Sequence, residues 1–211
     1  MFIVNEKMDK ACIAKMPRAD FMGEVEVVDT EEAADKALHY LSQFDVIGID
    51  SETRPAFVKG RSYKVALLQI STLEKCYLFR LNKLGLTPSL IQLLTNPKIL
   101  KIGLSLKDDL MMLHKRSPFK EQGCIDLQNV VGHFGIQDRS LQKIHANLFG
   151  EKISKAQRLS NWEADILQPA QQKYAAIDAW SCLVIYNRLQ QMKEQGYEVK
   201  PFVNKDTKNE L

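Results

Sequence analysis

Two carboxylates separated by one residue stand at the end of an apolar run in the segment VIGIDSETRP, residues 46–55. If this run forms a strand, Asp50 and Glu52 project from the same face about 6.6 Å apart, and Ser51 projects from the other face. Two like charges this close repel each other and raise a pKa unless a positive charge lies between them. A divalent cation with oxygen ligands would supply that charge. A strand that simply ends in solvent, where acids are common, is the alternative.

Two further groups of polar side chains occur later in the chain. Asp108 and Asp109 fall in the first turn of an expected helix, in KIGLSLKDDLMML, where the helix dipole alone favours acids. In QKYAAIDAW, Tyr174 and Asp178 are four residues apart and share one helix face. Their neighbours are apolar, so both side chains are expected to enter a largely buried surface, where a charge needs a partner. A packed phenol beside a surface ion pair is the alternative.

The elements expected around these residues form a mixed sheet with helices packed on it. Segments rich in Val, Ile, Leu and aromatic residues predict strands at GEVEVV, DVIGID, YKVALLQIST, KCYLFR and KILKIGL. Helices are expected after the capping residues Thr30, Thr87, Ser105, Asp126 and Ser140, and over about 168–195. The economical architecture is one α/β domain over residues 25–196, with an N-terminal arm over 1–24 and a polar tail over 197–211.

Composition and charge limit the kind of protein. The chain has 211 residues, of which 45% are hydrophobic, enough to bury the core of one compact domain. A net charge of +3 permits nucleic-acid binding without indicating it. The four cysteines form no CxxC pair, which disfavours a zinc site or a disulfide framework and favours a reducing, cytoplasmic environment. No segment approaches the ~20 apolar residues of a spanning helix, so no membrane association is expected.

The order of the acids resembles the motifs of the DEDD superfamily of 3′-5′ exonucleases. Acid-x-acid at the end of an early strand, an acid after a later strand and Tyr-x-x-x-Asp in a late helix are typical of the subclass whose third motif carries tyrosine. The segments VALLQIST and LSNWEADILQPAQQKYAAIDAWSCLVIYNRL extend the similarity to Werner-type exonuclease domains and, more distantly, to ribonuclease D enzymes. The resemblance covers about residues 25–195 and implies a ribonuclease H-like fold.

This resemblance implies a metal-dependent 3′-5′ exonuclease. Such an enzyme would use two divalent cations, Mg²⁺ or Mn²⁺, to release nucleoside 5′-monophosphates from a single-stranded 3′ end of DNA or RNA. Asp50 and Glu52 match the first motif, Asp109 the second, and Tyr174 with Asp178 the third. The resemblance implies that the four carboxylates hold the metal ions, with Asp50 bridging both, and that Tyr174 orients the attacking water.

Several neighbouring residues are less well defined by the resemblance. Asp108 remains an alternative to Asp109, because spacing alone does not decide between them. Thr53 and Arg54 stand where Werner-type domains are more apolar, which makes them candidate substrate-binding residues. The basic residues that follow either meet the substrate backbone or form a solvated loop; they are Lys59, Arg61 and Lys64. We expect Trp162 to pack beneath the site and assign no role to the four histidines.

Three other functions compete with this one. The first is a catalytically silent nucleic-acid-binding or scaffold domain, which the presence of all four acids disfavours. The second is an RNA-specific processing enzyme of the ribonuclease D kind. The third is a domain that works beside a helicase, which would be a separate partner because this chain has no room for one.

Overall fold

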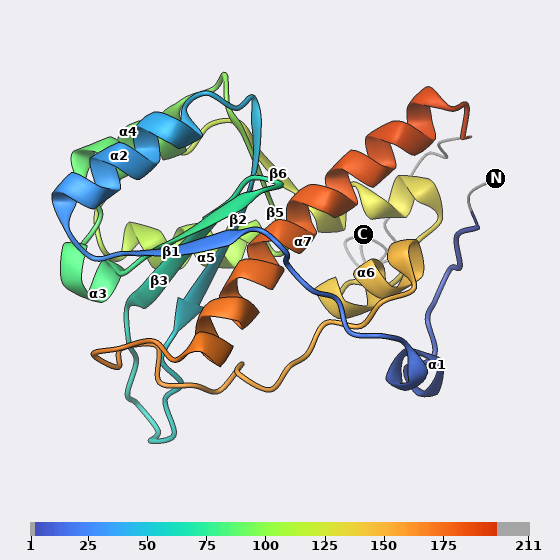
Figure 1. Cartoon of the computed structure of the whole chain (residues 1–211), viewed down its shortest axis with the longest axis horizontal. Coiled ribbons are helices and arrows are strands. Elements are labelled where there is room, and N and C mark those ends of the chain that lie inside the picture. The colour runs from blue at the N-terminus through green and yellow to red at the C-terminus, as the bar shows by residue number, and fades with distance from the viewer. Residues whose placement is uncertain (1–2, 198–211) are drawn as a thin grey trace, which may run out of the picture.

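A six-stranded sheet organises residues 3–197, the part of the chain that the computed structural model describes (Figure 1). Its strands are β1 (Glu24–Val28), β2 (Val46–Thr53), β3 (Val65–Ser71), β4 (Lys75–Phe79), β5 (Leu100–Gly103) and β6 (Cys124–Asp126). Their order across the sheet is β1-β4-β3-β2-β5-β6. The strand that carries Asp50 and Glu52, β2, is therefore internal and pairs with a neighbouring strand on each side.

The sheet is mixed, as the sequence predicts. β2, β3 and β4 pair antiparallel, whereas β1 pairs parallel with β4, and β5 pairs parallel with both β2 and β6. The predicted α/β class is confirmed. β6 is missing from the prediction because CID is only three residues long and shows no periodicity of its own.

Helices cover both faces of the sheet. They are α1 (Lys10–Lys15), α2 (Glu31–Leu41), α3 (Leu81–Leu84), α4 (Pro88–Thr95), α5 (Leu106–His114), α6 (Leu141–Phe149) and α7 (Pro169–Glu194), with 3₁₀ turns η1 (Leu127–Asn129) and η2 (Val131–Phe134). Side chains alternate along β4: Tyr77 and Phe79 pack in a core shared with α2, α4 and α5, whereas Cys76 and Leu78 pack with α7. Figure 1 shows α7 crossing the sheet diagonally.

Two of the predicted helix caps form as expected, and a third caps a different structure. The hydroxyls of Thr30 and Thr87 accept hydrogen bonds from backbone N–H groups in the first turns of α2 and α4, at 3.3 and 3.2 Å. Asp126 also caps the turn that follows it. The helix expected over 127–135 is wrong, however, because that segment forms only the two 3₁₀ turns, which end at Gly135.

Ser105 and Ser140 occupy N-cap positions, but neither side chain caps its helix. Ser105 adopts a left-handed φ of 59°, unusual for a residue other than glycine. Its backbone N–H donates to Asp126 Oδ1 at 3.0 Å, and its hydroxyl accepts from Gln128 Nε2 at 2.8 Å. Ser105 therefore ties the start of α5 to the end of β6, which fixes the position of the helix that carries Asp109.

The N-terminal segment lies along α6 and the chain that follows it (Figure 1). The backbone N–H of Asn5 donates to Asn147 Oδ1 at 2.9 Å, and that of Ala19 donates to the Lys152 carbonyl at 3.0 Å. Ile13, on α1, is buried. The arm thus contacts the domain from Val4 onward. Apart from Tyr197, whose hydroxyl donates to the Phe134 carbonyl at 3.1 Å, the predicted tail lies outside the described residues.

Within residues 3–197, none of the helices has the length and apolar character that crossing a membrane requires.

Candidate active site

Three carboxylates converge between β2 and α7. One oxygen each from Asp50, Glu52 and Asp178 lie within 4.8 Å of one another, and we call these three residues the acid cluster. Asp50 and Glu52 share the face of β2 that meets α7, because strand residues two apart project alike. Asp178 is only 8% exposed. Oxygen atoms this close form a ligand set suited to a hard divalent cation such as Mg²⁺ or Mn²⁺.

Gly48 allows α7 to come close enough to β2 for the cluster to form. A Cβ at this position would collide with the Ala179 carbonyl oxygen and come within 3.1 Å of Leu183 Cβ. Ala179 directly follows Asp178, so the point of closest approach lies beside the acid cluster. The small residues of α7 have the same effect on the other side of the contact, since Ala175, Ala176 and Ala179 are all buried.

We expect Gly48→Ala to destabilise the protein by about 2–3 kcal/mol, because the added methyl group overpacks a buried helix–strand contact. The shift of α7 should also weaken stabilisation by Mn²⁺ in thermal unfolding. Gly85→Ala is the control: Gly85 has φ +69 but nothing within 4 Å of an added Cβ, so only backbone strain is expected. A Gly48→Ala protein that kept the full Mn²⁺ effect would show that the close approach does not hold the cluster together.

Asp109 approaches the site from the opposite face of β2. It lies in the first turn of α5, and its Oδ1 accepts a hydrogen bond from the Ser51 hydroxyl at 2.5 Å. Asp109 is outside the acid cluster, but its charge acts on both Asp50 and Glu52. Asp108 is exposed. Of the two neighbours, Asp109 is therefore the one that the structure brings to the site, and Ser51, which sequence reasoning missed, is its partner.

Burial raises the pKa of every acid at the site, and repulsion from the other site acids adds to it at Asp50 and Glu52. Burial is the larger cause for Asp50, followed by the charges of Asp178 and Asp109, and together they hold its pKa well above the ordinary value. The same causes raise the pKa of Glu52 to about 9. Burial raises the pKa of Asp178 to about 7 and that of Asp109 to about 6. A bound cation would relieve this repulsion.

Tyr174 stands one helical turn before Asp178 and donates a hydrogen bond to it. Burial, and then the charges of Asp178 and Glu52, raise the pKa of the Tyr174 phenol, so it stays protonated at neutral pH. Its ring lies 6.0 Å from that of Trp162, which is fully buried as the sequence predicts. A cavity of about 340 Å³ that opens beside Tyr174 is also lined by Gln157 and Lys173.

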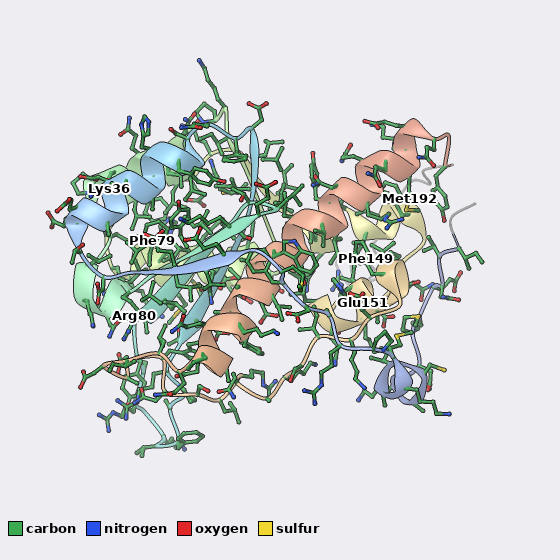
Figure 2. All side chains as sticks on the ribbon, in the orientation of Figure 1. Lys36, Phe79, Arg80, Phe149, Glu151 and Met192 are labelled. Carbon is green, nitrogen blue, oxygen red and sulfur yellow. The ribbon has the colours of Figure 1, made fainter. Side chains whose placement is uncertain are left out.

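The buried Arg80, labelled in Figure 2 at the end of β4, fastens the segment before α7 to the sheet. Its guanidinium donates to the backbone carbonyls of Ala164 and Asp165, the latter at 3.3 Å. Trp162 and Glu163 immediately precede these carbonyls. Arg80 thus positions both residues without touching the acids.

Arg54, a predicted substrate-binding residue, lies beside the site instead of within it. Its guanidinium is 3.3 Å from the Glu163 carboxylate and 4.9 Å from the centre of the Tyr63 ring. Thr53 ends β2 and is half-buried. Neither residue contributes to the acid cluster.

The histidines of the described chain contribute no ligand to the acid cluster. The most buried of them, His145, packs on α6 against the ring of Phe149 at 4.7 Å (Figure 2) and against that of Trp180 at 5.9 Å. Burial lowers its pKa to about 4, which keeps the ring neutral. His145 is a core residue.

The mixed sheet and the acids at the end of its central strand define the class of protein: an α/β domain with a ribonuclease H-like fold. Solved structures support this fold. The exonuclease domain of Aedes aegypti Nibbler has a TM-score of 0.71 at 24% identity, over 82% of this chain and 91% of that one. Escherichia coli RNase D has a TM-score of 0.70 at 23% identity, over 80% of this chain and 45% of that one.

The family itself follows from the sequence. A model described as 3′-5′ exonuclease matches residues 25–194, and the chain belongs to this family. The mouse bifunctional 3′-5′ exonuclease/ATP-dependent helicase WRN is 30% identical over 197 residues, which are 86% of this chain and 14% of that protein. Drosophila melanogaster exonuclease 3′-5′ domain-containing protein 2 is 31% identical over 82% of this chain and 30% of that protein. The chain thus spans less than a third of either relative.

Proposed function

We propose that this protein is a metal-dependent 3′-5′ exonuclease that hydrolyses DNA, RNA or both from the 3′ end. The observation that carries the proposal is the acid cluster itself, in a chain of the 3′-5′ exonuclease family. Three carboxylates close together at a partly buried site, with raised pKa values, are costly to a fold unless they bind something positive. A scaffold domain without activity would have no use for them.

Asp50, Glu52, Asp109 and Asp178 would hold two divalent cations, Mg²⁺ or Mn²⁺. When bound, such ions lower the pKa of a water and stabilise the charge that develops on the phosphate and the leaving oxygen. Asp50 would contribute a ligand to this metal site, where the charges of the other three acids all raise its pKa. The hydrogen bond from Ser51 would orient the Asp109 carboxylate toward the site.

Tyr174 would position the attacking water. Its phenol remains protonated at neutral pH and is therefore a hydrogen-bond donor and not a base. Water attacks phosphorus and gives up a proton to solvent, the bond from phosphorus to the 3′ oxygen breaks, and that oxygen leaves with a proton from solvent. The product is a nucleoside 5′-monophosphate.

We expect Tyr174→Phe to lower kcat about 10- to 100-fold while KM changes little, because the lost hydroxyl positions a reactant without binding substrate. The matched control is Tyr186→Phe, three turns later on the same helix. Steady-state kinetics of oligonucleotide shortening measure both variants. Equal losses in the two variants would remove Tyr174 from the mechanism.

The experiment that tests the proposal offers a 3′-recessed DNA duplex and a single-stranded RNA in Mn²⁺ and in EDTA. Stepwise shortening from the 3′ end in Mn²⁺ alone is the expected result. If neither strand is shortened, the proposal fails. Comparing DNA and RNA strands of the same 3′ sequence then assigns the preferred substrate.

Two further proposals concern a partner and the cellular compartment. WRN, by its name, joins an exonuclease to a helicase, so we propose that a separate helicase supplies unpaired 3′ ends to this chain. Purified helicase should raise the shortening of blunt duplexes if this is correct. All four cysteines are free, in keeping with a reducing compartment, and we propose the cytoplasm, which imaging of a tagged protein would test.

A further inference from the structure

The connection between β2 and β3, residues 54–64, is the most basic segment close to the acid cluster. It carries Arg54, Lys59, Arg61 and Lys64, and the sequence has no acid between Glu52 and Glu74. In Figure 1 it forms the loop that extends away from the lower end of the sheet, in teal. Cations that no acid of their own segment neutralises, beside a nuclease site, favour a polyanion.

A pocket of about 260 Å³ opens between this loop and the segment before α7. We call it the Tyr63 pocket; its lining includes Arg54, Phe57, Val58, Arg61, Tyr63 and Leu159. Three of these side chains are apolar and unusually exposed: Phe57 at 81%, Val58 at 64% and Leu159 at 60%. Apolar side chains this exposed, grouped in one concavity, indicate a binding surface.

The arginines of the pocket are held by an aromatic ring. The Arg54 and Arg61 guanidinium carbons lie 4.9 and 5.1 Å from the centre of the Tyr63 ring. Arg54 also pairs with Glu163, whereas Arg61 has no ion pair within residues 3–197. Stacking on Tyr63 fixes the Arg61 guanidinium in place and leaves its charge available to a phosphate.

The chain connects two walls of the pocket to the acid cluster. On one wall, Arg54 is two residues from Glu52 along the chain. On the other, Leu159 belongs to the segment that continues to Trp162, which packs against Tyr174. A strand whose 3′ end occupies the acid cluster would therefore have an upstream nucleotide within reach of the Tyr63 pocket.

We propose that the Tyr63 pocket binds an unpaired nucleotide of the substrate strand on the 5′ side of the scissile bond; this inference rests on the proposed exonuclease function. The base lies against the apolar side chains of Phe57 and Leu159, and the phosphate is bound by Arg61. Stacking on such side chains accepts any base, and a paired base is not free to enter. The pocket thus selects unpaired strands.

The test measures binding separately from hydrolysis. Fluorescence anisotropy in EDTA gives the Kd of a labelled single-stranded 12-mer for the wild type, for Phe57→Ala and for Leu159→Ala. Both side chains are exposed, so neither change should affect folding. We expect each variant to raise Kd about tenfold. Leu73→Ala, which removes an apolar side chain 54% exposed in the turn between β3 and β4, is the matched control and should leave Kd unchanged.

A set of 12-mers, each with one abasic site at a different position, then locates the nucleotide. At the position that enters the pocket, loss of the base should weaken wild-type binding about tenfold, and Phe57→Ala should add no further loss. Arg61→Gln should raise Kd for all of these strands, because it removes a phosphate contact.

The outcomes separate this inference from the proposed function. If the wild type shortens strands in Mn²⁺ but Phe57→Ala and Leu159→Ala bind as tightly as the wild type, the Tyr63 pocket is not a nucleotide site. If binding depends on Phe57 but no strand is shortened, the Tyr63 pocket is a nucleotide-binding site and the proposed exonuclease function is wrong. Phe57→Ala could also raise Kd equally for all of the abasic strands. That result would overturn the inference, because it would show that Phe57 contacts no base.

Discussion

Replacing Asp50 by Asn is expected to lower oligonucleotide shortening at least about 10³-fold, and Asp178→Asn should have a similar effect. Each change removes one of the three carboxylates that approach within 4.8 Å, and with it one of the proposed metal ligands. Loss of about 4 kcal/mol of transition-state stabilisation, reasonable for a disrupted metal site, corresponds to a factor of this size. Initial rates in Mn²⁺ at saturating substrate measure the effect.

Asp108→Asn is the matched control for Asp109→Asn. Asp108 is exposed, whereas Asp109 accepts the hydrogen bond from Ser51. Shortening should fall strongly in Asp109→Asn and stay within about twofold of the wild type in Asp108→Asn. The opposite result would assign the second motif to Asp108 and would contradict the geometry described above.

The metal-free protein is expected to lose stability as pH rises from 6.5 to 8.5. A carboxyl whose pKa is higher in the folded state than in the unfolded state binds more protons when the protein is folded. As pH rises between the two pKa values, the free energy of unfolding therefore falls. Glu52, with a pKa of about 9, keeps its proton over most of this window, whereas its carboxyl in the unfolded chain is ionised; Asp178, at about 7, loses its proton in the lower part of the window. A loss of about 3 kcal/mol would lower Tm by roughly 6 °C or more.

Thermal unfolding in EDTA and in Mg²⁺ measures this effect. Mg²⁺ should restore Tm most at pH 8.5, where the acids are most fully ionised and bind the ion best. The buried His145, with a pKa lowered to about 4, acts in the opposite direction only below its ordinary value of 6.5, so the chosen window excludes it. Asp50→Asn should flatten the pH dependence. A Tm in EDTA that is constant or rises over this window would show that the acids are not buried together.

Much of the fold follows from local patterns in the sequence. The central strands are long apolar runs, and Thr30 and Thr87 cap their helices through contacts with residues three positions away, which the sequence displays directly. Such patterns do not predict two short elements, β6 and α1. β6 has three residues and exists because β5 lies beside it. α1 has six residues and is held by tertiary contacts such as the burial of Ile13.

The sequence likewise predicts some features of the site and not others. The i, i+2 spacing of Asp50 and Glu52 and the i, i+4 spacing of Tyr174 and Asp178 predict which side chains share a face. No spacing predicts that Ser51 meets Asp109, since 58 residues separate them. The role of Gly48 is also invisible in the sequence, because it depends on the path of α7 across β2. The Tyr63 pocket forms only when two segments far apart in the sequence, one after β2 and one before α7, come together.

Hydrolysis in ¹⁸O-labelled water, with mass spectrometry of the products, tests the central claim most directly. If the acid cluster directs water onto the phosphorus next to the 3′ end, the wild type releases nucleoside 5′-monophosphates that carry one ¹⁸O in the phosphate, and Asp50→Asn releases none. Internal fragments, nucleoside 3′-monophosphates, or equal release by the wild type and Asp50→Asn would contradict the account.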